Sequence, residues 1–579
     1  MTGHDARARR AAGRLVAMAL LAVGLLACAG DQPMAPATGR TAPGPPSHTL
    51  NPACDPGLGG TTHTDSILAP QTWSRAGNPH RVNAWILIKG AGVLTLEPGV
   101  LVCAGNGGGL WASNGGRLVA NGLDTARIVL TASDPANGWW GVHLFGSPAS
   151  PSSLRHVRLE HTDQVTALST HDAHAANIDS SVFRQNEQGL FLWGSGTAIR
   201  RSRVDTVTSA TAAVMLGTGA TFEKTVIRGA VGTGMEVTGA SGVSLLGGRI
   251  EGSGGVGLRV TTPGYAFLAA QPVRVVGGAS YPAEMVVSAF AKVYVGPAQQ
   301  DSLLGNARDT VVITGGVLQW YANASSTIPW HVTDTIFVQW VGILHATPGA
   351  TLAMDPAVQI VARGGGTVVA RGSAAAPVLF TGAGGASWGG IMLYKDSGPV
   401  VTSYLTNVRV EYVRDWLAAG AFAYHTVVID SAVFRQNGWG PWVYSEYSRI
   451  SRSRVDTTLV DKPAVVLAGW ESMLESTLIR GSAGAGLSVD AGNAIVRQCE
   501  IRESASDGIF NWGAAPVHDC NLIQNAGVGI NDPYYGSSNV ENNWWGDAAG
   551  PTGLSGDGVS GTVDYTPWRT TPYVLPYVP

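Results

Sequence analysis

The sequence predicts an all-β fold: a right-handed parallel β-helix, or solenoid, with coils of 21–24 residues, arranged as two tandem super-repeats. Apolar residues recur every 21–24 positions, and long segments recur about 251 positions apart. Glycine, with 77 of the 579 residues, separates short runs rich in Val, Ile and Leu. One short strand cannot bury its apolar side alone, but stacked coils pair their backbones and share one core.

The short period gives a column of apolar residues that we expect to point inward. The column comprises Leu159, Val182, Val204, Ile227 and Ile250 in the first half, and Val410, Val433, Val455, Ile479, Ile501 and Leu522 in the second. Charged residues alternate with it and should point outward, as the two-residue period of a strand requires. Leucine-rich repeats have a different consensus, propeller blades need about 40 residues, and left-handed hexapeptide helices need multiples of six.

The longer repeat sets the domain organisation. Ile178–Asn186 recurs as Ile429–Asn437, and Arg201–Thr206 recurs as Arg452–Thr457. The short period breaks between residues 261 and 335, which we interpret as the junction between the copies. The predicted segments are a signal peptide (1–27), a flexible tether (28–53), the first super-repeat with its N-terminal cap and the junction (54–315), the second super-repeat (316–545), and a C-terminal cap and tail (546–579).

The N-terminus has the pattern of a bacterial export signal. Four arginines precede an apolar run over residues 15–26, which is too short to span a bilayer. The string Leu-Leu-Ala-Cys that ends at Cys28 resembles the lipobox of bacterial lipoproteins. This resemblance implies that Cys28 carries diacylglycerol and attaches the chain to a membrane. Because Ala29 follows, the outer membrane is favoured, and we expect a cell-envelope lipoprotein that is periplasmic or surface-exposed.

Charge and cysteine content limit the partners and the cross-links. The net charge is −3 and only 13% of residues are charged, which disfavours nucleic acid because phosphate binding needs a clustered basic surface. We expect a monomer. In an oxidising compartment Cys54 and Cys103 can clamp the N-terminal cap to an early coil. Cys499 and Cys520 should stack in neighbouring coils, either as a disulfide or as two small buried residues.

Several strings resemble secreted right-handed β-helix proteins of the pectin-lyase-like superfold. They are Leu94–Val100, Gly116–Gly122, Ile128–Thr131 and the closing Asn543–Gly546, and the resemblance covers nearly all of residues 80–568. It implies the fold, and it admits activity on acidic polysaccharide, with calcium as the cofactor of a lyase. The catalytic strings of those enzymes are missing from the sequence. The weak catalytic candidates are Arg203, Asp205, Arg454 and Asp456, which we interpret instead as a self-compensating ladder of charges.

A cluster of histidine and aspartate raises the question of a metal site. The weak candidates are His161, Asp163, His171 and His174. Their spacing is irregular, and only His174 has a counterpart in the second half, His425. A solvated loop with incidental histidines is therefore the favoured interpretation, and we predict neither a metal nor another cofactor.

Aromatic residues are the most suggestive feature for function, since exposed rings can stack on sugar faces or pack on a protein partner. The candidate ligand-binding residues are Trp416, Tyr424, Trp439, Trp442, Tyr444, Tyr447, Phe191 and Trp193. A loop that folds over its own rings would explain them too. We predict a non-catalytic binding or surface-display lipoprotein for polysaccharide or an envelope partner. The alternatives are a polysaccharide lyase or glycoside hydrolase acting on an acidic polysaccharide, and a purely structural spacer.

Overall fold

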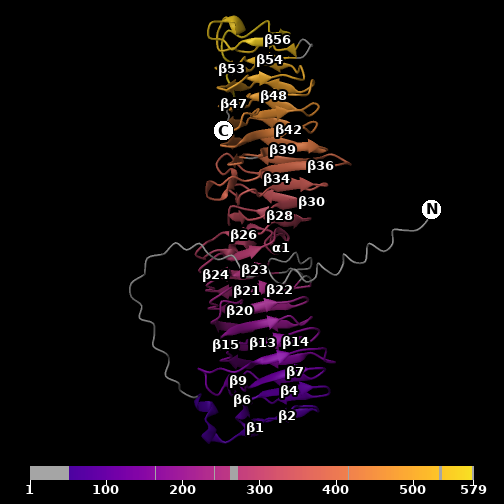
Figure 1. The fold of residues 1–579 in the computed structure, drawn as a ribbon, viewed down its shortest axis with the longest axis vertical. Coiled ribbons are helices and arrows are strands. Elements are labelled where there is room, and N and C mark those ends of the chain that lie inside the picture. Colours follow the sequence, from indigo (N-terminus) through magenta and orange to yellow (C-terminus); the bar gives the residue numbers. More distant parts are fainter. Residues whose placement is uncertain are drawn as a thin grey trace, which may run out of the picture. The chain divides into compact units, whose positions relative to one another are not determined.

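The computed structural model describes residues 51–163, 165–239, 242–260, 271–414, 416–533 and 538–576. They form an all-β parallel solenoid of about 20 turns with very little helix, which confirms the predicted fold class (Figure 1). The predicted signal peptide, Cys28, most of the tether and residues 261–270 of the junction lie outside the described residues. None of the helices in the described part has the length and apolar character needed to cross a membrane.

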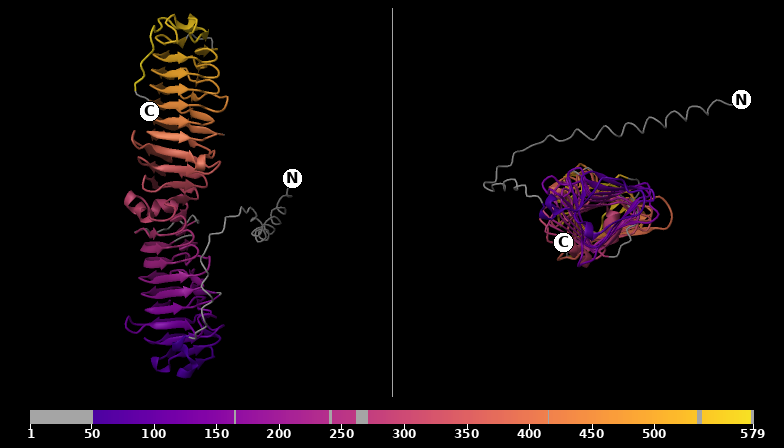
Figure 2. Two further views of the ribbon diagram at one scale, coloured as in Figure 1. Left: turned by 90° about the vertical axis from the view of Figure 1, so that its left-hand side faces the viewer. Right: turned by 90° about the horizontal axis from the view of Figure 1, so that it is seen from below.

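Each regular turn contributes one strand to each of three parallel ladders, so the coil is three-sided in cross-section (Figure 2). In the first half we number them ladders 1, 2 and 3. Ladder 1 contains β1 (Thr61–His63), β3 (His80–Val82), β6 (Leu101–Ala104), β9 (Ile128–Ala132), β12 (Val157–Glu160), β15 (Val182–Asn186), β18 (Arg203–Val207), β20 (Thr221–Arg228), β22 (Ser244–Glu251) and β24 (Arg274–Val276). Ladder 3 contains β2 (Gln71–Trp73), β5 (Val93–Leu96), β8 (Arg117–Asn121), β11 (Ser152–Arg155), β14 (Ala176–Asp179), β17 (Ala198–Arg200) and the first halves of β20 and β22.

Ladder 2 runs through both halves of the solenoid. It contains β4 (Trp85–Lys89), β7 (Gly109–Ser113), β10 (Val142–Leu144), β13 (Thr166–Thr170), β16 (Gln188–Leu192), β19 (Val214–Leu216), β21 (Met235–Val237), β23 (Leu258–Val260), β25 (Ala283–Met285), β26 (Val311–Ile313), β29 (Trp330–Val332), β32 (Thr351–Met354), β35 (Val378–Gly382), β38 (Val408–Glu411), β41 (Val433–Arg435), β44 (Arg454–Asp456), β47 (Leu478–Arg480), β50 (Glu500–Arg502) and β53 (Asn521–Ile523). Its continuity makes it the reference for comparing the halves.

Two new ladders complete the turns of the second half. Ladder 4 contains β27 (Gly316–Leu318), β30 (Ile336–Gln339), β33 (Ile360–Arg363), β36 (Ile391–Lys395), β39 (Leu417–Ala423), β42 (Trp439–Val443), β45 (Val465–Leu467), β48 (Leu487–Val489), β51 (Ile509–Phe510), β54 (Ile530–Asp532) and β56 (Val559–Gly561). Ladder 5 contains β28 (Tyr321–Ala324), β31 (Ile343–Ala346), β34 (Thr367–Arg371), β37 (Val401–Thr406), β40 (His425–Asp430), β43 (Arg449–Ser451), β46 (Met473–Glu475), β49 (Ile495–Arg497) and β52 (Val517–His518). A pair near the C-terminus, β55 (Ser538–Asn539) with β57 (Val563–Asp564), lies outside these ladders.

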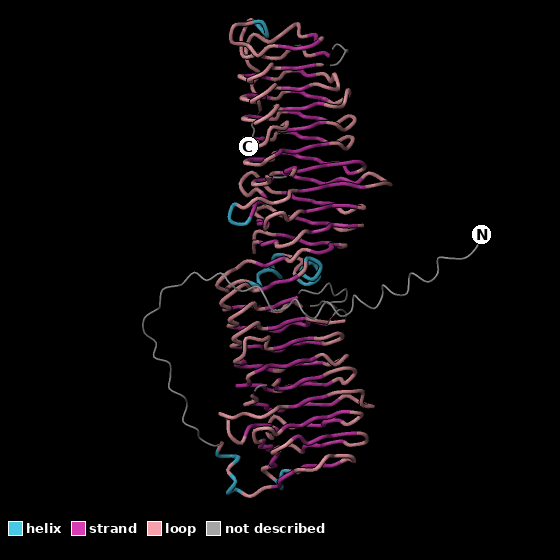
Figure 3. Tube along the Cα trace, in the orientation of Figure 1, coloured by secondary structure: helices cyan, strands magenta, loops and turns pink. Residues whose placement is uncertain are grey.

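Two helices, α1 (Val287–Val293) and α2 (Pro297–Gln300), interrupt the strands between β25 and β26 (Figure 3). Phe290 of α1 packs edge-on against Trp330 with ring centroids 5.0 Å apart, and both side chains are fully buried. The Gln300 side chain is also buried, and its amide donates to the carbonyls of Tyr294 and Asn323. The described part of the junction therefore has a buried aromatic contact, and a polar network fixes its helices.

The inward column differs from the predicted one at one residue in each half. Register pairs Leu159 with Phe183 and Phe183 with Val204, and Phe183 is fully buried. Val182 is half-buried on the outward side, between Arg158 and Arg203, so its predicted inward position is wrong. The second half repeats the correction, because Phe434 is buried and Val433 is not.

A left-handed corner residue before each strand explains this register. His156, Ser180, Arg201 and Lys224 have φ values of 48°, 50°, 46° and 44°. In each case the third residue after the corner points inward, which gives Leu159, Phe183, Val204 and Ile227. The corner determines which residues of the following strand point inward. The 21–24-residue period alone places the inward residue one position too early, at Val182 instead of Phe183.

A column of small polar side chains lies two residues before the inward apolar column. The Ser181 hydroxyl accepts from the backbone N–H of Val157 at 3.1 Å, and Ser202 accepts from Ser181 at 3.2 Å. Cys499 and Cys520 occupy this column in the second half, where the N–H of Cys499 donates to Cys520 Sγ at 3.4 Å. Both cysteines are buried and free, so the disulfide considered for them is not formed.

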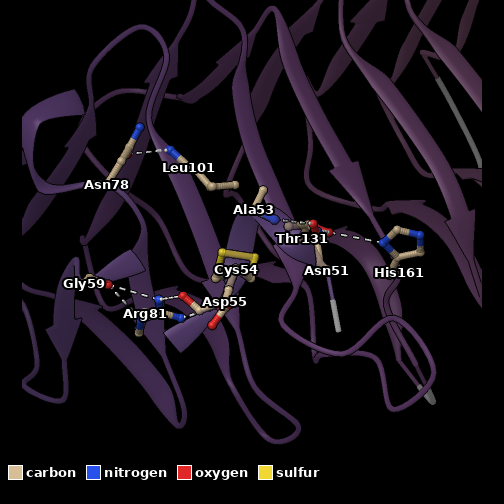
Figure 4. Close-up of a disulfide and its surroundings, with 11 residues drawn as sticks. Asn51, Ala53, Cys54, Asp55, Gly59, Asn78, Arg81, Leu101, Thr131 and His161 are labelled. Carbon is tan, nitrogen blue, oxygen red and sulfur yellow. Dashed lines mark hydrogen bonds between the residues drawn. A yellow bond between two sulfur atoms is a disulfide. The ribbon is translucent and has the colours of Figure 1, made fainter. Parts of the chain in front are cut away.

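The N-terminal cap is fastened across ladder 1. A disulfide joins Cys54 to Cys103 of β6 (Figure 4). The Arg81 guanidinium donates to the carbonyls of Cys54 and Asp55, each at 2.7 Å. Residues 51–58 therefore cover the outward face of the first turns.

Candidate functional site

A continuous band of aromatic rings covers the outward face of ladder 2 in the first half. Trp111 stacks on Phe145 with ring centroids 5.2 Å apart. Phe145 stacks on His171 with ring centroids 4.2 Å apart and an interplanar angle of 6°. His171 meets Trp193 edge-on at 5.1 Å, and Trp85 meets Trp111 edge-on at 5.2 Å. We call this set the first ring band: Trp85, Trp111, Trp140, His143, Phe145, His171, Phe191 and Trp193.

Strand periodicity puts these rings on one face. On β16 the leucines Leu190 and Leu192 point into the core, so Phe191 between them points out. The rings of Phe145, His171 and Trp193 follow the ends of β10, β13 and β16, and their backbones continue the ladder. Because parallel strands stack in register, the equivalent residue of each turn lies above that of the last.

The second half carries the same arrangement on ladder 4. Trp439 stacks on Trp442 at 4.8 Å, Trp442 lies 6.3 Å from Tyr444, and Tyr444 stacks on Phe422 at 5.2 Å. Register places Tyr394 of β36 beside Phe422. We call this set the second ring band: Tyr394, Phe422, Trp439, Trp442 and Tyr444.

The two bands correspond at three positions. Phe145, His171 and Trp193 follow the inward residues Leu144, Thr170 and Leu192, just as Tyr394, Phe422 and Tyr444 follow Leu393, Ala421 and Val443. The surroundings repeat too. Trp139 and Trp388 each donate to a glutamate carbonyl at 2.8 Å, and the Ser152–His174 contact of 2.8 Å recurs as Ser403–His425.

Sequence reasoning found part of these bands. It placed Trp439, Trp442 and Tyr444 together, and Phe191 with Trp193, and the structure brings each group together. Trp416, Tyr424 and Tyr447 are about half exposed and belong to neither band. The missed members are Trp85, Trp111, Trp140, His143, Phe145, Tyr394 and Phe422. The signal that could have found them is the outward phase, because each lies one residue from a buried apolar residue.

Two histidines and one tyrosine of the ring bands have shifted pKa values, and the carboxylates Asp172 and Asp490 act on His171 and Tyr444 respectively. Burial lowers the pKa of His143, which is opposed by a hydrogen bond with the Trp140 carbonyl, and burial also lowers the pKa of His171. Both imidazoles are therefore uncharged at neutral pH. Burial raises the pKa of Tyr444, so its hydroxyl stays protonated. The bands therefore present aromatic faces and a few hydrogen-bonding edges, with these two carboxylates nearby.

The metal candidates lie in separate surroundings. His161 contacts Thr131 at 3.2 Å and Gln185 at 3.0 Å, whereas His171 is a member of the first ring band. His174 is fully buried and contacts Ser152, so it is not in a solvated loop as expected. The Asp163 N–H donates to the Trp139 carbonyl. No group of three metal-ligating side chains comes together among the described residues.

The catalytic candidates lie in two ladders of alternating charge. Register runs Glu160, Arg184, Asp205, Arg228 and Glu251 along ladder 1, with Arg203 paired to Asp205. Along ladder 2 it runs Glu411, Arg435, Asp456 and Arg480, and Arg454 contacts Asp456 at 2.6 Å. Each carboxylate thus has arginine neighbours within its strand and across the turns.

Replacing either candidate arginine should therefore have a small effect on stability. We expect Arg203→Ala and Arg454→Ala each to lower the free energy of unfolding by less than ~1 kcal/mol, because partly exposed ion pairs contribute little. Urea unfolding followed by circular dichroism measures the change. A loss of several kcal/mol would mean that the ladder is a structural core element.

A groove on ladder 1 is the second candidate site. Its volume is about 630 Å³, and residues 51–53 cover one edge through the Asn51–Thr131 contact (Figure 4). The lining includes Arg75, Arg158 and Arg184 but only one carboxylate, Glu160, which is 2% exposed. That carboxylate contacts Arg184 at 2.6 Å and Arg158 at 3.3 Å. Glycoside hydrolysis ordinarily needs two carboxyl groups, so the groove favours binding an anion over hydrolysis.

Comparisons with protein-family models, with curated proteins and with solved structures find no match to this chain.

Proposed function

We propose that this chain is a non-catalytic binding lipoprotein of the bacterial cell envelope that holds a neutral polysaccharide on its ring bands. The proposal includes attachment through lipid at Cys28 and a right-handed, pectin-lyase-like winding, both supported by the sequence strings that carry those resemblances. Its main support is that the two aromatic bands coincide at three equivalent positions of the two halves.

The chemistry of the bands fits the faces of sugar rings. The C–H faces of pyranoses are apolar, so they stack on aromatic rings, while their hydroxyls remain available to water. Adjacent turns repeat at about 4.8 Å, which places successive rings along a line that an extended glycan can follow. Since His143 and His171 are uncharged at neutral pH and the charged groups that act on His171 and Tyr444 are the carboxylates Asp172 and Asp490, a neutral β-linked glucan or xylan suits the bands better than a uronic acid polymer.

Removing two rings from one band should weaken binding strongly. For Phe191→Ala/Trp193→Ala and for Trp442→Ala/Tyr444→Ala we expect the affinity of the altered band to fall by about tenfold or more. Each lost ring contact contributes roughly 1 kcal/mol, and 1.4 kcal/mol corresponds to a factor of ten. Affinity electrophoresis in gels containing soluble β-glucan or xylan, followed by calorimetry with the matching oligosaccharides, measures the change.

The chain offers a matched control for these variants. Trp416→Ala/Tyr447→Ala removes two exposed rings that lie outside both bands, and its mobility in the polysaccharide gels should equal that of the wild type. Equal losses in the control and the band variants would refute specific binding by the bands. Failure of the wild-type chain to bind any neutral polysaccharide would refute the proposed function.

The groove on ladder 1 favours a second candidate function, a lyase acting on an acidic polysaccharide. Three arginines and one carboxylate line the groove, so it has the charge to hold a uronate. Incubation with polygalacturonate and calcium, monitored by the ultraviolet absorbance of unsaturated product, tests it. Product that disappears in Arg158→Ala but persists in Arg409→Ala, the equivalent arginine of the second half, would establish this function instead.

A further inference from the structure

We infer that the chain binds two polysaccharide strands at once, on different sides of the solenoid, and thereby cross-links them. The inference rests on the proposed function of the ring bands. Its structural basis is the course of ladder 2 along the solenoid, which the fold determines whether or not a ligand is bound.

Ladder 2 continues across the junction without a break. Met285 of β25 pairs with Ile313 of β26, and Ile313 pairs with Val332 of β29. From β29 the ladder proceeds through β32, β35 and β38 to β41. The same side of the coil can therefore be followed from the first turns to the last.

The equivalent segments of the two halves lie on different sides of this coil. Ile178–Asn186 ends in β15 on ladder 1, whereas its copy Ile429–Asn437 ends in β41 on ladder 2. The first ring band lies on ladder 2, and the second lies on ladder 4. The second half is thus displaced by one side of the three-sided coil relative to the first.

The junction turn accounts for this displacement. After β25 the chain forms α1 and α2 in place of two strands and then returns to ladder 2 with β26. α1 packs beneath β27 and β28, the first strands of ladders 4 and 5. The buried contact of Phe290 with Trp330 joins the helices to the second half, so the displacement is built into a packed core rather than a flexible linker.

A single glycan cannot run along one side from the first band to the second. Beyond Phe191 the outward residues of ladder 2 are Met215, Glu236, Arg259 and Glu284, and Arg259 contacts Glu284 at 3.1 Å. Further on, ladder 2 carries the charged ladder that begins at Glu411. The neutral surface therefore ends on this side, and the second band begins on another, which makes two separate sites.

Cross-linking by the full chain can be measured with the same soluble β-glucan or xylan that it retards in gels. We expect the hydrodynamic size of the polymer, measured by light scattering, to rise to a maximum at an intermediate protein ratio and to fall with excess protein. Calorimetry with a short oligosaccharide should give two sites per chain. Sedimentation of the chain without ligand must show a monomer, so that bridging through protein dimers is excluded.

Variants of one band separate bridging from binding. Phe191→Ala/Trp193→Ala and Trp442→Ala/Tyr444→Ala should each keep one oligosaccharide site at wild-type affinity and weaken the other by about tenfold or more. At concentrations near the wild-type Kd they should therefore lose the scattering maximum, whereas Trp416→Ala/Tyr447→Ala should keep both sites and the maximum. Binding without a maximum in the wild type, one site in the wild type, or cross-linking by a one-band variant would each overturn the inference while leaving the proposed function intact. Absence of any binding would overturn the proposed function, and the inference with it.

Discussion

Replacing Phe183 with alanine should lower the free energy of unfolding by about 3–5 kcal/mol, the usual result of removing a buried phenylalanine from a close-packed core. Phe183 is fully buried between Leu159 and Val204 of the adjacent turns. Val182→Ala should cost less than ~1 kcal/mol, because Val182 lies half-buried on the outward side and leaves no internal cavity. Urea unfolding measures both. Hydrogen exchange adds local resolution, because stacked turns can unfold separately.

The second half offers the same comparison independently. Phe434 takes the place of Phe183, and Val433 takes the place of Val182. Phe434→Ala should again lower the free energy of unfolding strongly, and Val433→Ala should lower it only slightly. A greater loss of stability for either valine variant than for its phenylalanine partner would show that the register of this column is wrong.

The coil and its period could be predicted from the sequence, but the phase of individual strands could not. In Ile178–Asn186 a valine and a phenylalanine stand side by side, and both satisfy an apolar column. The choice depends on a left-handed corner three residues before the inward position, at Ser180 in the first copy and Ser431 in the second. Serine and arginine rarely adopt positive φ, so their sequence gives little sign of such a corner.

The ring bands could be predicted only where their members are close in sequence. Trp439, Trp442 and Tyr444 lie within one strand and its end, and they were found. Trp85 and Trp111 come from different turns and meet only through the register of β4 with β7. The displacement of the second half could not be predicted either, because it depends on how α1 and α2 replace strands in one turn.

Acidification should destabilise the chain well before its carboxylates titrate. Burial is the largest cause of a lowered pKa at seven histidines, namely His63, His80, His143, His171, His174, His345 and His425. For His425 the pKa falls from 6.5 to about 4. Below pH 6.5 the unfolded chain binds protons that the folded chain does not, so stability falls as pH falls, by up to ~1.4 kcal/mol per pH unit for each such histidine.

The decisive variant removes the two equivalent buried histidines, His174 and His425, each of which contacts a serine at 2.8 Å. His174→Gln/His425→Gln loses those contacts and should be less stable than the wild type near neutrality. Its stability should nevertheless fall less steeply between about pH 6.5 and 5, because two fewer protons are taken up on unfolding. Urea unfolding at a series of pH values gives the slope. Equal slopes for the two proteins would contradict the prediction. They would mean that both imidazoles bind protons as readily in the folded solenoid as in the unfolded chain, despite their complete burial.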